Sequence, residues 1–109
     1  MSHLKIFFLA IALAIGCLAW SEISLAHSAF MNCTDSDDGN ITCEGGFSDG
    51  SSASGVKVKV IGADGQEIAS GAMNADDEYV FKKPTVDYKV VFDAGDGHDV
   101  TVEGKNIVK

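Results

Sequence analysis

Two histidines are the side chains in this sequence best suited to binding a transition metal. His27 follows an apolar N-terminal segment, and His98 lies near the C-terminus in the stretch FDAGDGHD. The remaining histidine, His3, belongs to the N-terminal segment. Neutral imidazole is a common ligand of nickel, copper and zinc. The two histidines therefore predict a metal site if the fold brings them together.

The N-terminal residues have the pattern of a secretory signal peptide. The weakly basic start MSHLK is followed by the apolar run IFFLAIALAIGCLAW, which is shorter than the ~20 residues that a membrane-spanning helix needs. The small residues of SLA then precede His27. We therefore expect a signal peptide over residues 1–26, cleavage after Ala26, and a periplasmic or other extracytoplasmic protein with no membrane span. An alternative is a lipoprotein anchored at Cys17, although AIGC lacks the leucine usual three residues before such a cysteine.

Cleavage after Ala26 would give His27 a second donor, the free α-amine of the mature N-terminus. The amine has an ordinary pKa of about 7.7–8.0 and imidazole one of about 6.5, so both can be neutral donors near neutral pH. Together they form a chelate that suits nickel, copper or cobalt.

The cysteine spacing predicts a disulfide between Cys33 and Cys43. Export places them in an oxidising compartment, and TDSDDGNIT between them has a turn signal at its centre. A hairpin symmetric about Asp38 sets the two cysteines directly opposite each other, where Cβ atoms are ~4.5–5.5 Å apart. The same register pairs Met31 with Gly45 and Ala29 with Phe47. A thiolate metal site is the alternative, but two cysteines without CxxC spacing are poorly suited to one.

Charge and composition argue against some classes of function. The chain has 109 residues, with 8 basic against 16 acidic residues and a net charge of −8. We expect no nucleic-acid partner, because phosphate binding needs a basic surface. An acidic surface is compatible with cations, or serves solubility alone. No catalytic motif is present, so we expect a binding protein and not an enzyme.

Residues 27–109 alternate apolar and polar side chains in short runs separated by turns. We predict a single all-β domain, a small antiparallel β-sandwich of about seven strands. The Ser-rich stretch 48–55 is predicted to be a loop within this domain. Four aromatic residues alternate as core residues: Tyr79, Phe81, Tyr88 and Phe92.

Side-chain parity suggests how the histidines could meet. His27 shares parity with Met31 and Cys33 of the first strand, and His98 shares parity with Val100 of the last strand. If these two strands run parallel and adjacent, both imidazoles lie at the same end of the sandwich. A turn histidine that only bonds local backbone is the alternative for His98.

Acidic residues and glycines accompany His98. Gly95 and Gly97 permit positive φ, so the chain can turn sharply before the histidine. Asp93 and Asp96 are candidate carboxylate ligands, or side chains that orient an imidazole; solvation of the turn is the other role for Asp96.

Two further acidic runs are assigned to turns. They comprise Asp35, Asp37 and Asp38, which we expect at a solvated hairpin tip without EF-hand spacing, and Asp76, Asp77 and Glu78, for which weak cation binding is the alternative.

Three segments resemble a known family: AHSAF, EGGFSDGSSASGVKVKVIGADGQEIASG and VVFDAGDGHDVTVEG. Over residues 26–103 the chain is similar to the small periplasmic accessory proteins of nickel and cobalt ECF-type transporters, described as carboxypeptidase-regulatory-like domains. The resemblance implies an immunoglobulin-like or transthyretin-like β-sandwich, His27 and His98 as ligands of Ni²⁺ or Co²⁺, and a membrane-embedded metal permease as partner. The cysteine pair is not part of the family pattern.

Two alternatives remain open beside this expectation. A periplasmic copper-binding protein could use the same histidines, since Cu²⁺ binds such donors more tightly. A structural or carbohydrate-contacting sandwich without metal predicts a stripe of surface aromatics.

Overall fold

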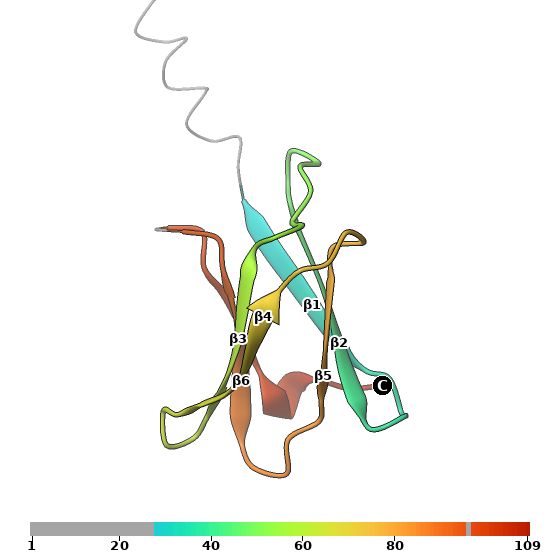
Figure 1. The fold of residues 1–109 in the computed structure, drawn as a ribbon, viewed down its shortest axis with the longest axis vertical. Helices are drawn as coiled ribbons and strands as arrows, with labels where there is room; N and C mark the ends of the chain where they lie inside the picture. The colour runs from blue at the N-terminus through green and yellow to red at the C-terminus, as the bar shows by residue number, and fades with distance from the viewer. Residues whose placement is uncertain (1–27, 96) are drawn as a thin grey trace, which may run out of the picture.

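The computed structural model describes residues 28–95 and 97–109, which form two antiparallel sheets facing each other (Figure 1). The first sheet has the strand order β1-β2-β5, and the second has the order β4-β3-β6-β7. The predicted seven-stranded antiparallel sandwich is confirmed in this part of the chain. The elements are β1 (Ala29–Asp35), β2 (Asn40–Phe47), β3 (Lys57–Gly62), β4 (Glu67–Ala72), β5 (Glu78–Lys82), β6 (Tyr88–Asp93), β7 (Val100–Glu103) and the short 3-10 helix η1 (Gly104–Asn106).

Outside β4, the strands form where apolar residues or glycines recur at every second position. In β3, Val58 and Val60 are fully buried between the lysines that face outward, and in β6 Val90 and Phe92 are fully buried. β-Branched and aromatic side chains suit such half-buried strands. Phe47 and Phe92 join the two sheets, with ring centroids 5.9 Å apart. The core therefore lies between the sheets, as the alternation predicts.

The distribution of strands follows an immunoglobulin-like arrangement. The first, second and fifth strands share one sheet, and the third, sixth and seventh share the other. The fourth strand pairs with β3 through a turn in which Gly65 has φ +84°. Glycine adopts this left-handed conformation without steric cost, and an Asp-Gly pair such as Asp64-Gly65 is common in such hairpin turns.

The first and last strands are neighbours across the two sheets and do not pair within one sheet. β1 contacts β7, and the N–H of Asp35 at the end of β1 donates to the Val108 carbonyl, 3.0 Å away, in the segment after η1. The start of β1 and the β6–β7 loop both lie at the upper end in Figure 1. Side-chain parity suggested that these two segments share one end of the sandwich. They do so because the edge strands β1 and β7 pack against each other across the two sheets.

Candidate functional site

His98 lies in the loop between β6 and β7, directly after a tight turn. Its N–H donates to the Gly95 carbonyl at 3.0 Å, and Gly95 and Gly97 have φ values of +103° and +78°. Both glycines thus adopt the positive φ for which the sequence suits them. This turn hydrogen bond uses only the backbone N–H of His98. The half-buried imidazole takes no part in it, so its role depends on the side chains around it.

The His98 pocket, as we name it, is a shallow hollow of about 190 Å³ lined by Phe47, Ser51, Ala94 and His98. Phe47 ends β2, Ala94 follows β6, and Ser51 belongs to the Ser-rich loop 48–55. Segments far apart in the sequence therefore meet beside the imidazole.

The first described residue of the chain lies close to this pocket. Ala29 is the register partner of Phe47. One residue earlier, Ser28 accepts a hydrogen bond from the Ser48 N–H at 2.8 Å and donates its own N–H to Ser48 Oγ at 2.9 Å. His27, one peptide bond before Ser28, lies outside the described residues, so its predicted part in the site stays a prediction.

Of the two predicted carboxylate ligands, the structure describes only one. Asp96 lies outside the described residues. Asp93 pairs in register with Lys57 and lies next to the inward-facing Phe92, so its side chain is on the outer face of the sheet. Its carboxylate accepts a hydrogen bond from the Gly95 N–H at 3.3 Å. Asp93 therefore shapes the turn and does not line the His98 pocket.

Within residues 28–95 and 97–109, no group of three or more His, Cys, Asp or Glu side chains is placed to hold a metal ion. A site at His98 would consequently need donors from His27 or from solvent in addition to those described. The same residues include no helix long and apolar enough to cross a membrane.

The Ser-rich loop 48–55 is an organised wall of the pocket, which the sequence did not reveal. The Asp77 carboxylate accepts hydrogen bonds from Ser52 Oγ at 2.6 Å and from the Ala53 N–H at 2.9 Å, and Ala53 is fully buried. Sequence reasoning assigned Asp77 to a turn, where it does lie with φ +61°. Its bond to a loop 24 residues earlier depends on tertiary packing and has no local signal.

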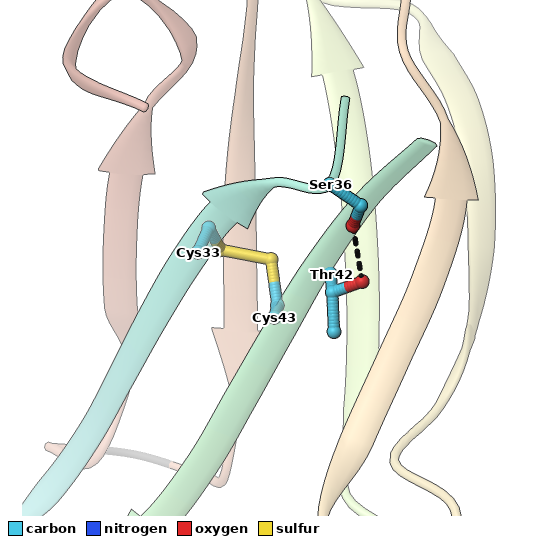
Figure 2. Close-up of a disulfide and its surroundings, with 4 residues drawn as sticks. All are labelled: Cys33, Ser36, Thr42 and Cys43. Carbon is cyan, nitrogen blue, oxygen red and sulfur yellow. Dashed lines mark hydrogen bonds between the residues drawn. A yellow bond between two sulfur atoms is a disulfide. The ribbon is translucent and has the colours of Figure 1, made fainter. Parts of the chain in front are cut away.

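The disulfide between Cys33 and Cys43 is present and joins the neighbouring strands β1 and β2 (Figure 2). The two cysteines are direct register partners, as are the other predicted pairs of the hairpin. Ser36 and Thr42 share a hydrogen bond of 2.8 Å nearer the tip. Because both sulfurs are crosslinked, neither is a thiolate ligand.

At the acidic hairpin tip Asp37 and Asp38 are exposed, as predicted, whereas Asp35 at the end of β1 is more strongly engaged. Asp35 forms an ion pair of 2.8 Å with Lys83, and only 10% of its side chain is exposed. The hydrogen bond from Lys83 lowers the pKa of Asp35. Asp37 forms a second ion pair, 2.9 Å long, with Lys109. These carboxylates hold lysines, which gives them a structural role.

Larger hollows lie at the opposite end of the sandwich, around the loop between β5 and β6. They measure about 450, 360 and 320 Å³, and all three have lysines in their lining. Asp87, Tyr88 and Glu103 line the hollows of 450 and 320 Å³. Burial raises the pKa of the Tyr88 phenol, which keeps it neutral. Their lining has no histidine or cysteine, so the His98 pocket is the better candidate for metal chemistry.

Comparison of the chain with protein-family models, curated proteins and solved structures finds no match.

Proposed function

We propose that the protein is an extracytoplasmic metal-binding accessory protein that captures Ni²⁺ or Co²⁺ and passes the ion to a membrane-embedded permease. The observation that carries this proposal is the His98 pocket. Its wall residue Phe47 is the register partner of Ala29, which stands two residues after His27. His98 thus lies at the end of the sandwich where the described chain begins at Ser28, the residue after His27.

The donor set explains why a carrier is the favoured class. The α-amine and imidazole of a mature N-terminal His27, with the imidazole of His98, are intermediate donors that suit Ni²⁺, Co²⁺ and Cu²⁺. The remaining coordination positions stay open to water, a carboxylate or a group from the permease. An open shell favours exchange of the ion, whereas a structural site is closed.

The compartment is inferred from two features. Disulfides such as Cys33–Cys43 persist in oxidising environments outside the cytoplasm. Residues 1–26, which lie outside the described residues, have the sequence pattern of a secretory signal.

The alternatives are separated by different observations. Among the described residues Phe30 is the large aromatic that is clearly exposed, at 47%, while Phe81 and Phe92 are buried. A carbohydrate-contacting face needs several exposed aromatics, so this favours the metal proposal. Copper uses the same donors, and metal analysis of the protein purified from its own host distinguishes it from nickel and cobalt.

Nickel titration of the exported protein tests the proposal. The full-length gene is expressed with its leader, and mass spectrometry of the product should find His27 as the first residue. Calorimetry should then show binding of one Ni²⁺ per chain, weakening at acidic pH as the nitrogen donors protonate. An N-terminus elsewhere would remove the amine ligand.

Removal of the second imidazole gives the matched comparison. His98→Ala retains the backbone hydrogen bond to Gly95 and should keep the far-UV spectrum, because only the side chain is lost. We expect Ni²⁺ affinity to fall by about tenfold or more. Wild-type affinity in His98→Ala would show that His98 is a turn residue only.

A further inference from the structure

Strand β5 forms an edge of the first sheet. In the strand order β1-β2-β5 it comes last, and within the described residues it pairs with β2 alone. The N–H of Lys83, just after β5, donates to the Gly39 carbonyl at 2.9 Å, beside the start of β2. Because backbone groups alternate in direction along an antiparallel strand, the N–H and C=O groups of Val80 and Lys82 point away from the sheet. This edge of β5 can therefore accept another strand.

The other three edges of the sandwich are less suited to pairing. β1 and β7 contact each other across the sheets, and the Asp35 N–H at the end of β1 bonds the segment after η1. β4 has a bulge, because its register with β3 shifts between Val60 and Ile61. Covering segments and bulges both hinder pairing with another chain. The register of β5 with β2, in contrast, is continuous from Glu78 to Lys82.

The outward side chains of β5 are complementary to themselves. Tyr79 and Phe81 pack against the core, so Glu78, Val80 and Lys82 lie on the outer face of the sheet. Val80 at the centre is 52% exposed. A second copy of β5, antiparallel and centred on Val80, would place valine opposite valine and each Glu78 opposite a Lys82. Residues in such opposed positions have Cβ atoms ~4.5–5.5 Å apart.

The charges at this edge are uncompensated within one copy. The register partner of Glu78 on β2 is Glu44, which is exposed on the same face. Like charges directly opposite each other destabilise a sheet. Neither glutamate forms an ion pair in the described part of the chain, and nor does Lys82. A lysine from a second copy would offset the two glutamates.

We propose that two copies of the protein pair through their β5 edges, antiparallel and related by a two-fold axis at Val80. The pairing joins the two three-stranded sheets into one continuous sheet. The interface is the same patch on both copies, as a two-fold axis requires. Because the strand is short, we expect a weak dimer with a Kd on the order of 100 µM. The pairing does not depend on metal binding.

Charge reversal tests the predicted contact between Glu78 and Lys82. Glu78→Lys and Lys82→Glu each place like charges opposite each other across the axis, and each should weaken dimerisation by about tenfold. The double variant, with both substitutions, restores opposite charges in reversed order and should return to within about threefold of wild type. Lys59→Glu, on the central strand β3, makes the same charge change as Lys82→Glu and should stay within about twofold.

Sedimentation velocity of the exported protein in a chelator, from about 10 to about 500 µM, measures the monomer–dimer equilibrium. Far-UV spectra check that each variant is folded. Mixing the two single variants should give more dimer than either variant alone, because the mixed pair sets two lysines against two glutamates.

Different outcomes would overturn different parts of the proposal. A wild-type protein that stays monomeric over the whole range would mean that the charges of β5 keep this edge apart from other strands. A double variant as weak as the single ones would show that Glu78 does not face Lys82. Equal losses in Lys59→Glu and Lys82→Glu would mean that net charge alone controls association.

Discussion

At the scale of single residues, Asp77 anchors the Ser-rich loop that contributes Ser51 to the His98 pocket. Its carboxylate caps the Ser-rich loop through Ser52 and Ala53, and its carbonyl accepts the Gly45 N–H at 2.9 Å. The positive φ at Asp77 adds a requirement, because among non-glycine residues aspartate and asparagine tolerate it best. Asp77 therefore has three structural roles: it forms its own turn, accepts a hydrogen bond from β2, and anchors the distant Ser-rich loop.

Replacement of Asp77 should separate the carboxylate from the backbone requirement. Asp77→Asn keeps an acceptor and tolerates positive φ, so we expect a loss of about 1 kcal/mol or less in the free energy of unfolding. Asp77→Ala loses both hydrogen bonds and strains the backbone, and should cost about 2–3 kcal/mol. Urea unfolding measures both values. Equal losses would contradict the capping role.

At the scale of elements, β2 is the central strand of its sheet and accommodates large neighbours through two glycines. A Cβ at Gly45 would lie 2.7 Å from the buried ring of Phe92 and 2.9 Å from Met73. A Cβ at Gly46 would lie 2.6 Å from the Phe30 ring, which is half exposed on the outer face. Successive residues of one strand thus face a packed core and a movable side chain.

Alanine at these two glycines should show the difference. Gly45→Ala forces a methyl group against the core and should destabilise the protein by about 1–3 kcal/mol. Gly46→Ala can displace the exposed Phe30 ring toward solvent, and we expect the smaller loss. The pair shares strand and substitution, so each is the other's control in thermal unfolding. A larger loss at Gly46 would show that Phe30 is fixed.

At the scale of the whole molecule, Asp35 connects the two sheets at the end opposite His98. It terminates β1 of the first sheet, binds Lys83 after β5, and through its N–H holds Val108, which follows the second sheet. The lowered pKa of Asp35 and the raised pKa of Lys83 both result chiefly from their mutual hydrogen bond. A carboxyl whose pKa is lowered by folding stabilises the fold above its ordinary value, and this contribution is lost as the pH falls through the lowered pKa.

The stability that the Lys83–Asp35 ion pair provides should therefore disappear in acid. Lys83→Met keeps the aliphatic stem and should melt at a lower temperature than wild type at neutral pH. The difference should close well below pH 3.8, the ordinary pKa of Asp35, where the carboxyl is protonated. Lys82→Met is the control, since no ion pair of Lys82 is found in the described part of the chain. A pH-independent difference would contradict the ion pair.

Local patterns in the sequence account for the strands and for the hairpin that carries the disulfide. Alternation of residues such as Val58 and Val60 specifies which face is buried, and a ten-residue separation around a turn specifies that Cys33 meets Cys43. Both depend on neighbours in the chain and on the period of a strand. The sharp turn at the glycines before His98 could likewise be predicted from the sequence, because positive φ is a local property of the backbone.

The tertiary structure alone decided which distant segments surround His98. Phe47 reaches the pocket because the two sheets pack face to face, and Ser51 reaches it in a loop that Asp77 holds from another strand connection. Side-chain period says which way a residue faces but not which strand it faces, so the sequence did not indicate that Ser51 and Phe47 lie beside His98. Such contacts depend on how the sheets stack, which is a property of the whole core and of no single segment.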